Sequence, residues 1–174
     1  MVGKRLQTAV SLTEIGLTMA GGKSKKTIRK RPLWTCPKCS HRFVTPNMWH
    51  SCSRYPLSHH FKGKEPIVRE LFDHYLALVE SFGQVTVIPQ KTGIAFQVRV
   101  RFAGAYARKN WLDCSVWLKR RAEHPLFYRI ESVTSKDHIH RFRLKSLADL
   151  RDKTLKAFLR EAYAVGCQEH LYGR

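Results

Sequence analysis

The strongest apolar pattern in the chain is a helical one between residues 66 and 82. Apolar side chains recur there every three or four positions, at Ile67, Val68, Leu71, Phe72, Tyr75, Leu76, Val79 and Phe82. This spacing places them on one side of a helix, which then has one face to bury. Pro66 suits the first turn and Gly83 suits the C-terminal end, so we expect an amphipathic helix over 66–82.

Alternating apolar and polar residues, typical of strands with one buried face, follow this helix. They occur at 84–89, 94–102, 111–119, 126–133 and 138–144. Residues 90–93 form a turn between the first two segments, and 134–137 are typical of a hairpin turn between the last two. The pattern therefore predicts a mostly antiparallel sheet of about five strands.

A second helix is expected to close the fold between Ser146 and Gly166. Ser146 is followed three residues later by Asp149, which is typical of a capping box at a helix start. Apolar residues then recur at helical spacing, at Leu147, Leu150, Leu155, Phe158, Leu159 and Ala162. The order helix, strands, helix predicts an α+β fold in which both helices cover one face of the sheet.

The other face of the predicted sheet collects arginines, because Arg99 and Arg101 point away from the apolar side of their strand. The candidates there for contact with a nucleic acid or another ligand are Lys91, Arg99, Arg101, Arg108, Arg129, His138, His140, Arg141 and Arg143, with Trp111 and Trp117 beside them. Guanidinium groups next to aromatic rings suit phosphates and unstacked bases. A solvated sheet face without a ligand explains the same residues.

A separate cluster of Cys and His residues lies in the segment WTCPKCSHRFVTPNMWHSC, residues 34–52. Cys36 and Cys39 form a Cys-x-x-Cys pair, whose spacing lets two thiolates reach one ion. His50 and Cys52 follow as a His-x-Cys pair. Three sulfurs and one imidazole are a ligand set that zinc uses in closed structural sites.

Other uses of this segment fit its residues less well. A redox Cys-x-x-Cys is expected where a strand enters a helix, and an iron–sulfur cluster calls for four nearby cysteines. A catalytic zinc keeps one position open, whereas four ligands are available here and His41 is a spare imidazole. We therefore expect a structural Zn²⁺ that stabilises a small module, with Phe43, Trp34 and Trp49 as its apolar cluster.

The composition adds a strong positive charge. The 174 residues include 32 Lys and Arg against 13 Asp and Glu, for a formal net charge of +19. Such a surface favours an anionic partner, first DNA or RNA, with an acidic protein or a phosphorylated small molecule as alternatives. The five cysteines, three of them clustered, suit a reducing compartment, and no run reaches the roughly 20 apolar residues that span a membrane. We expect a soluble, cytoplasmic protein with no membrane partner.

The charge is concentrated near the N-terminus. Residues 1–33 hold eight Lys and Arg against one Glu, and the run KSKKTIRKR has neither a strand nor a helix pattern. This predicts a flexible basic arm that either follows a phosphate backbone or remains a solvated leader. After it we expect a zinc-knuckle module and linker over 34–60 and the α+β domain over 61–170.

Several motifs occur in a fixed order along the chain. They are Trp-x-Cys-Pro-x-Cys from Trp34, His50-Ser51-Cys52, Lys91-Thr92-Gly93-Ile94-Ala95-Phe96, then His140 and Ala162-Tyr163. Together they resemble an uncharacterised prokaryotic family known only as a domain of unknown function, in which a zinc-ribbon-like knuckle often precedes the Lys-Thr-x-Ile-Ala-Phe domain. The resemblance spans about residues 34–166 and implies no reaction. The ligand-binding candidates that it implies are Lys91, Thr92, Phe96 and His140, although a Lys-Thr-Gly turn with Phe96 in the core explains the same residues.

Signs of catalysis are few. Asp113 and Glu131 are the acids that lie well inside predicted strands, and no carboxylate arrangement typical of a Mg²⁺-dependent nuclease occurs. No Walker loop, nucleophile elbow or dinucleotide-binding turn is present. Acid–base chemistry on a phosphodiester by His138, His140 and Lys91 stays open. The leading prediction is a zinc-binding, nucleic-acid-associated protein, with a phosphodiester- or nucleotide-acting enzyme and a protein–protein adaptor as alternatives.

Overall fold

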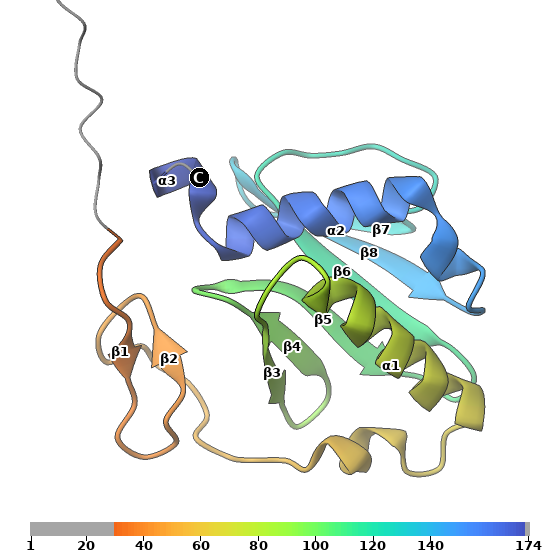
Figure 1. Ribbon diagram of the computed structural model, residues 1–174, viewed down its shortest axis with the longest axis horizontal. Coiled ribbons are helices and arrows are strands. Elements are labelled where there is room, and N and C mark those ends of the chain that lie inside the picture. Colours follow the sequence, from red (N-terminus) through yellow and green to blue (C-terminus); the bar gives the residue numbers. More distant parts are fainter. Residues whose placement is uncertain (1–29, 173–174) are drawn as a thin grey trace, which may run out of the picture.

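The computed structural model describes residues 30–172, which form a small two-stranded sheet beside a larger sheet and its covering helices (Figure 1). The basic arm expected over 1–33 lies almost wholly outside the described residues. Within the described range, no helix has the length and apolar character that crossing a membrane requires.

The larger sheet has six antiparallel strands in the order β3-β4-β5-β6-β8-β7. Their bounds are β3 Thr86–Pro89, β4 Ile94–Gln97, β5 Arg101–Ala107, β6 Leu112–Leu118, β7 Arg129–Thr134 and β8 Asp137–Leu144. Helices α1 (Pro66–Glu80) and α2 (Lys153–Gly166) lie on the same face of this sheet (Figure 1). The predicted α+β fold, with both helices on one sheet face, is confirmed.

The core lies between these helices and the sheet. The buried residues of α1 belong to the predicted apolar stripe and are Val68, Leu71, Phe72, Tyr75 and Val79. The rings of Phe72 and Tyr75 lie 6.1 and 5.4 Å from the ring of Phe96 in β4, which is fully buried. Burying an apolar side chain of this size contributes roughly 1.5–3 kcal/mol, so this face fixes α1 on the sheet. Phe96 is therefore a core residue and not a ligand contact.

Residues 94–102 form two strands where the sequence predicts one. A bend over 98–100 separates β4 from β5. The backbone N–H groups of Arg99 and Val100 both donate to the carbonyl of Gly166, at 3.0 and 3.1 Å. Gly166 ends α2, and the last carbonyls of a helix have no partner within it. The alternating pattern cannot reveal a bend that is set by a residue so distant in sequence, and the sheet has six strands instead of about five for this reason.

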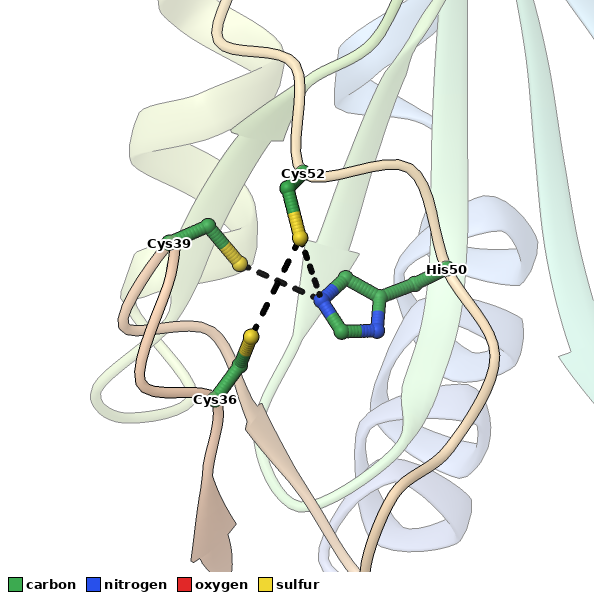
Figure 2. A group of neighbouring side chains, drawn as sticks. All are labelled: Cys36, Cys39, His50 and Cys52. Atoms are coloured by element: carbon green, nitrogen blue, oxygen red, sulfur yellow. Dashed lines mark hydrogen bonds between the residues drawn. The ribbon is translucent and has the colours of Figure 1, made fainter.

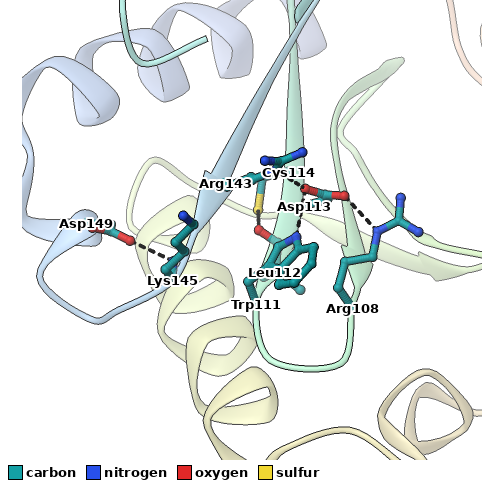
Figure 3. Close-up of polar contacts among 8 residues, drawn as sticks. All are labelled: Arg108, Trp111, Leu112, Asp113, Cys114, Arg143, Lys145 and Asp149. Carbon is teal, nitrogen blue, oxygen red and sulfur yellow. Dashed lines mark hydrogen bonds and ion pairs between the residues drawn. The ribbon is translucent and has the colours of Figure 1, made fainter. Parts of the chain in front are cut away.

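The closing helix begins later than the sequence predicts. The Asp149 carboxylate accepts a hydrogen bond from the N–H group of Lys145 at 2.7 Å (Figure 3) and another from the N–H group of Ser146 at 3.0 Å. These bonds belong to a separate 3-10 turn, η2 (Asp149–Arg151). The side chain of Asp152 then caps α2 by accepting from two N–H groups of its first turn. The predicted end at Gly166 is confirmed, whereas the predicted start is wrong because a second aspartate provides the cap.

The first described part of the chain forms a knuckle, residues 34–55, around the sheet of β1 (Trp34–Thr35) and β2 (Arg42–Phe43). The 3-10 helix η1 (Leu57–Phe61) leads from it to α1, and a short helix α3 (Glu169–Tyr172) follows α2. The knuckle packs on the sheet face opposite the long helices, where the Gln97 amide donates to the Arg42 carbonyl at 2.6 Å. Gln97 is 5% exposed, so this end of the face is covered and not solvated.

Candidate metal centre and adjoining cleft

Backbone hydrogen bonds shape the turn that carries Cys36 and Cys39. The Cys36 N–H donates to the His41 carbonyl at 2.9 Å, and the Ser40 N–H donates to the Cys36 carbonyl at 2.8 Å. Ser40 has a φ of 61°, in the left-handed region that residues other than glycine adopt only where the surroundings require it. Strands β1 and β2 flank the turn, and both thiols point to the same side (Figure 2).

His50 and Cys52 approach these thiols from the segment that follows β2 (Figure 2). The Sγ atoms of Cys36 and Cys52 are 3.9 Å apart. The Nε2 atom of His50 lies 3.2 Å from Cys39 Sγ and 3.4 Å from Cys52 Sγ. All four ligand atoms lie within 4.8 Å of one another, so the structure brings together the four residues predicted as metal ligands.

These separations fit one tetrahedrally coordinated ion. With metal–sulfur bonds of about 2.3 Å and metal–nitrogen bonds of about 2.0 Å, a tetrahedron has S···S edges of about 3.8 Å and S···N edges of about 3.5 Å. The observed 3.9, 3.2 and 3.4 Å lie close to these edges. The cluster could therefore hold a metal ion with every coordination position filled by a side chain.

A backbone carbonyl orients the His50 ring. Its Nδ1–H donates to the Met48 carbonyl at 2.6 Å, and this hydrogen bond raises the pKa of His50. A proton on Nδ1 leaves the lone pair of Nε2 to face the sulfurs, which is how metal-binding histidines are usually held. The same bond closes the turn over 48–50, so the position of the imidazole and the local backbone conformation depend on each other.

The clustered thiols differ in acidity. Burial opposes ionisation of Cys36, but the backbone N–H groups of Cys39 and Lys38 and the neighbouring side chains lower its pKa to about 6. Burial, together with the thiols of Cys39 and Cys36, raises the pKa of Cys52 to about 11. Neighbouring sulfurs that disfavour a second thiolate are stabilised together once a divalent cation lies between them.

Aromatic rings pack beside the cluster. The ring of Phe43 lies 4.5 Å from the ring of His50 and 6.1 Å from that of Trp34. Trp49, the third predicted member of this apolar cluster, is 92% exposed, so that prediction is wrong. Neighbouring side chains in a non-helical segment point to different sides, and His50 takes the inward position. The spare imidazole of His41 lies outside the group of four ligand atoms.

The sheet face away from the long helices holds a first carboxylate with two arginines, on β6 and its neighbours. The side chain of Asp113 is 9% exposed and lies 2.7 Å from Arg108 and 3.3 Å from Arg143 (Figure 3). The indole N–H of Trp111 also donates to Asp113, at 3.1 Å. The Arg143 guanidinium lies over the ring of Tyr128, 4.3 Å from its centroid. Both arginines are thus held by a buried carboxylate.

A second carboxylate on the same face repeats this arrangement. Glu131 lies 2.9 Å from Arg129 and 2.7 Å from Arg141. The hydrogen bond from Arg141 lowers the pKa of Glu131. The two clusters together are called the acid-paired region below, and its members are Arg108, Asp113, Arg129, Glu131, Arg141 and Arg143. Its carboxylates neutralise part of its positive charge.

The two histidines expected on this face lie on the opposite one. His138 and His140 of β8 are 7% and 0% exposed and share the buried side of the strand with Phe142. His140 Nε2 accepts a hydrogen bond from the Ala122 N–H at 2.9 Å, and burial lowers the pKa of His140. Strand alternation separates these histidines from Arg141 and its neighbours, so the expectation that they join the arginines is wrong.

The remaining candidates line a cleft of about 940 Å³ between the knuckle and the β3–β5 end of the sheet. This knuckle cleft has Lys91, Thr92, Arg99 and Arg101 on its sheet side. Its other lining residues include Met48, Trp49, His50 and Tyr55 from the knuckle and Trp117 from β6. The knuckle, which contributes the candidate ligand His50, and the sheet thus form two walls of one cleft.

Three cations of the knuckle cleft pair with no carboxylate among the described residues: Lys91, Arg99 and Arg101. Arg99 donates to two neutral oxygens, the side chain of Gln168 at 3.0 Å and the carbonyl of Arg31 at 2.6 Å. Burial lowers the pKa of Arg101, as expected for a cation without a carboxylate beside it. Their charge is therefore available to an anion that enters the cleft.

A comparison with protein families identifies the family to which the chain belongs. The family model described as "Domain of unknown function (DUF5655)" matches residues 57–166. The chain belongs to this family. The match confirms the resemblance to a domain of unknown function, and the family description names no activity. Searches among curated proteins and among solved structures gave no match.

The DUF5655 segment begins with η1 and ends with α2, and it contains the whole six-stranded sheet. The four Cys and His residues of the metal cluster precede it. The knuckle cleft therefore lies between the DUF5655 domain, which supplies its cations, and a preceding module, which supplies the candidate metal centre and Trp49.

Two residues of this cleft are not identified as functional by the sequence patterns. Gln97 lies on the polar side of its strand, and nothing in the alternation indicates that it anchors the knuckle through the Arg42 carbonyl. Trp49 is expected among the apolar residues of the metal module and instead stands at the cleft. A tryptophan directly beside a metal-ligand histidine is the signal that could have identified it, because the ligand must point inward and its neighbour outward.

Proposed function

We propose that this protein holds a structural Zn²⁺ between Cys36, Cys39, His50 and Cys52 and binds nucleic acid through the knuckle cleft and the positive surface around it. The observation that carries the proposal is that a Cys3His cluster and three cations without a carboxylate partner in the described part of the chain adjoin the same cleft, which His50 of the cluster lines. The metal-bound Cys3His cluster holds the knuckle in place, and the three cations supply the positive charge that phosphates require.

The ligand set supports zinc. Thiolates with one imidazole in tetrahedral array favour Zn²⁺ over harder ions such as Mg²⁺ or Ca²⁺, which prefer oxygen ligands. Four side chains fill the coordination sphere, so the ion serves the fold and has no position for a substrate. The knuckle has only two strands of two residues each, and metal binding supplies the folding free energy that so small a core lacks.

Charge supports a nucleic-acid partner. The net charge of +19 attracts a polyanion over long range, and Lys91, Arg99 and Arg101 offer short-range contacts at one site. A cytoplasmic location fits this proposal, because a reducing compartment keeps the thiols available to the metal. The proposal retains residues 1–33 as a basic arm, 34–60 as the knuckle module and linker, and 61–170 as the α+β domain.

The enzyme and adaptor alternatives have less support. The imidazoles of His138 and His140 are buried in the core, and the carboxylates of Asp113 and Glu131 each hold two arginines. General acid–base work needs groups that a substrate can reach, so these four are poorly placed for it. An adaptor that docks on an acidic protein would use the same cations, and the binding experiment below separates it from the proposal.

Metal content and copurifying nucleic acid test the proposal first. The full chain, expressed without a metal-binding tag, is expected to carry one equivalent of zinc by elemental analysis and to show an absorbance ratio typical of bound nucleic acid before a high-salt wash. After nuclease treatment, recovery of one stoichiometric protein partner in place of nucleic acid would favour the adaptor.

A matched pair of charge reversals then tests the cleft. Lys91→Glu lies in the cleft, whereas Lys156→Glu makes the same change in net charge on the exposed side of α2. We expect Lys91→Glu to weaken binding of mixed DNA and RNA pools by roughly tenfold and to reduce the salt dependence, with a smaller effect of Lys156→Glu. Equal effects of the two variants would remove the cleft from the proposal, and no binding at low salt would refute it.

A further inference from the structure

We infer that the ligand of the knuckle cleft is single-stranded nucleic acid, with a base stacked on Trp49 and phosphates held by Lys91 and Arg101. This inference rests on the proposed function and names the substrate class of its site. DNA and RNA single strands share this chemistry, and the experiment below treats them as separate arms.

The size of the cleft favours single strands. The cleft has a volume of about 940 Å³, which is of the order of a few nucleotides, whereas a B-form duplex, whose major groove alone is about 12 Å wide, is a much larger object. A few nucleotides with splayed bases fit between the knuckle and the sheet, and a duplex does not enter. A duplex could reach only the outer rim of the cleft.

Trp49 provides the stacking surface. Its side chain is 92% exposed, and the adjacent Met48 is 41% exposed, so the rim of the cleft presents an uncovered apolar patch. Tryptophan is highly buried on average, and adjoining exposed apolar residues at the mouth of a cleft are typical of interaction sites. An indole face accepts any base, because every base has a π-face, and single-strand binders combine such faces with a positive groove. Trp117 gives the cleft a second indole, on its sheet side.

The cations lie where the phosphates of such a strand would run. Lys91 stands in the turn between β3 and β4, whereas Arg101 begins β5 opposite Gln97, at the other end of β4. Both line the knuckle cleft, so they offer two separate phosphate contacts along it. Neither pairs with a carboxylate among residues 30–172. A strand that turns its bases toward the knuckle and its phosphates toward the sheet can stack on Trp49 and pair with the cations at the same time.

The metal cluster positions the knuckle wall. Trp49 lies between Met48, whose carbonyl accepts the His50 Nδ1–H, and His50 itself, whose Nε2 faces the sulfurs. The residue that carries the stacking ring is thus fixed on both sides by the metal-ligand turn. Binding of single strands is therefore expected to need the metal although no metal ligand touches the strand.

The test uses the zinc-loaded full chain and fluorescence anisotropy at about 50 mM salt. The probes are eight-nucleotide oligo-dT and oligo-U, with an eight-base-pair hairpin duplex as the double-stranded probe. We expect one or both single strands to bind at least tenfold more tightly than the duplex. Trp49→Ala should weaken single-strand binding by about tenfold, as loss of one stacked base does, and Trp49→Phe should restore most of it.

Tyr128→Ala is the matched control, because Tyr128 is an exposed aromatic residue in contact with the acid-paired region and outside the cleft. It should leave single-strand binding within about twofold of the unmodified chain. Zinc content and the melting temperature of Trp49→Ala should be unchanged, since the ring is exposed.

Three results overturn the inference. Duplex binding as tight as single-strand binding, or Trp49→Ala binding as well as the unmodified chain, refutes the single-strand assignment and leaves the proposed function intact. Absence of binding to every probe refutes both. If one of the two single strands binds and the other does not, the inference stands and the sugar is identified.

Discussion

The two ends of one sheet face differ in how their arginines are used. In the acid-paired region, two carboxylates hold four arginines at 2.7–3.3 Å. At the other end, the knuckle covers the sheet, and Lys91, Arg99 and Arg101 line a cleft without a carboxylate partner in the described chain. The difference teaches that the number of arginines on a surface does not locate a binding site. In the acid-paired region, Asp113 and Glu131 neutralise part of the positive charge and fix the arginine side chains.

The comparison also indicates which region the proposed Zn²⁺ would affect. The acid-paired region belongs entirely to the DUF5655 domain, whose core is formed by α1, α2 and the sheet. The knuckle cleft has a wall that carries the candidate metal centre, and the four residues of this centre lie outside that domain. Loss of the metal should therefore affect one region and spare the other, and variants of each region should have opposite effects on nucleic-acid binding.

The largest expected effect comes from Cys39→Ser, or from removal of the metal with a chelator. Cys39 is 3% exposed and its Sγ lies 3.2 Å from His50 Nε2, so its loss opens the coordination sphere. Structural zinc contributes apparent folding free energies of roughly 10–16 kcal/mol in small zinc modules. We expect the backbone amide signals of residues 34–55 to collapse in two-dimensional NMR spectra, while those of the DUF5655 domain persist and the knuckle cleft no longer binds nucleic acid.

The control for this change is Cys167→Ser, which alters the same chemical group outside the cluster. It should keep one equivalent of zinc. Retention of a full equivalent by Cys39→Ser would contradict the assignment of the ligands.

Asp113→Asn should make the acid-paired region resemble the cleft. The variant removes a carboxylate that faces Arg108 and Arg143 and leaves two cations unneutralised on the sheet face. We expect a loss of about 1–3 kcal/mol in the free energy of unfolding, measured by urea denaturation, together with tighter nucleic-acid binding at low salt.

Asp73→Asn makes the same change in net charge at the exposed Arg69–Asp73 pair of α1. There the stability cost should stay below about 0.5 kcal/mol, because exposed helix pairs contribute little. If both variants changed binding equally, the acid-paired region would have no particular influence.

Gln97→Ala tests the contact between the two parts of the molecule. The variant removes the hydrogen bond from the buried amide to the Arg42 carbonyl, which should cost about 0.5–1.5 kcal/mol. Faster amide hydrogen exchange in the knuckle and a severalfold weaker affinity for single strands are expected. Thr86→Ala alters the exposed residue paired with Gln97 on β3 and should show neither change.

The smallest effect is the pH dependence contributed by Glu131. Arg141 lowers its pKa in the folded protein below the ordinary 4.5, so the folded state favours the charged form. This contribution to stability is present above about pH 4.5 and is lost as the pH falls through the folded value. Glu131→Gln should flatten the pH dependence of the urea midpoint below that pH by less than about 1 kcal/mol, because the pair is partly exposed. An unchanged profile would show that the pair contributes nothing.

Much of the fold could be predicted from local patterns. The helix over 66–82, the hairpin around 134–137 and the end of the closing helix at Gly166 follow from periodicity and from turn and cap residues. The four Cys and His residues that come together follow from spacing alone, since Cys-x-x-Cys and His-x-Cys each turn two ligands to one side.

The errors have two kinds of cause, a contact between distant residues and a local choice between two capping aspartates. The bend over 98–100 depends on the carbonyl of Gly166, and the start of α2 depends on Asp152 capping the helix while Asp149 binds Lys145 and Ser146. Neither contact leaves a periodic trace in the sequence. The sequence likewise does not show that His138 and His140 fill the core or that Trp49 turns outward.

The sequence by itself determined the types of the main elements, the α+β class, the net charge and the four residues that meet at the candidate metal centre. Only the tertiary structure decided which cations keep their charge available and where the knuckle rests on the sheet. Periodicity and short spacings are local properties that a chain carries in its order of residues. Charge neutralisation and cleft formation depend on which groups the folded chain brings together, and those groups come from segments far apart in the sequence.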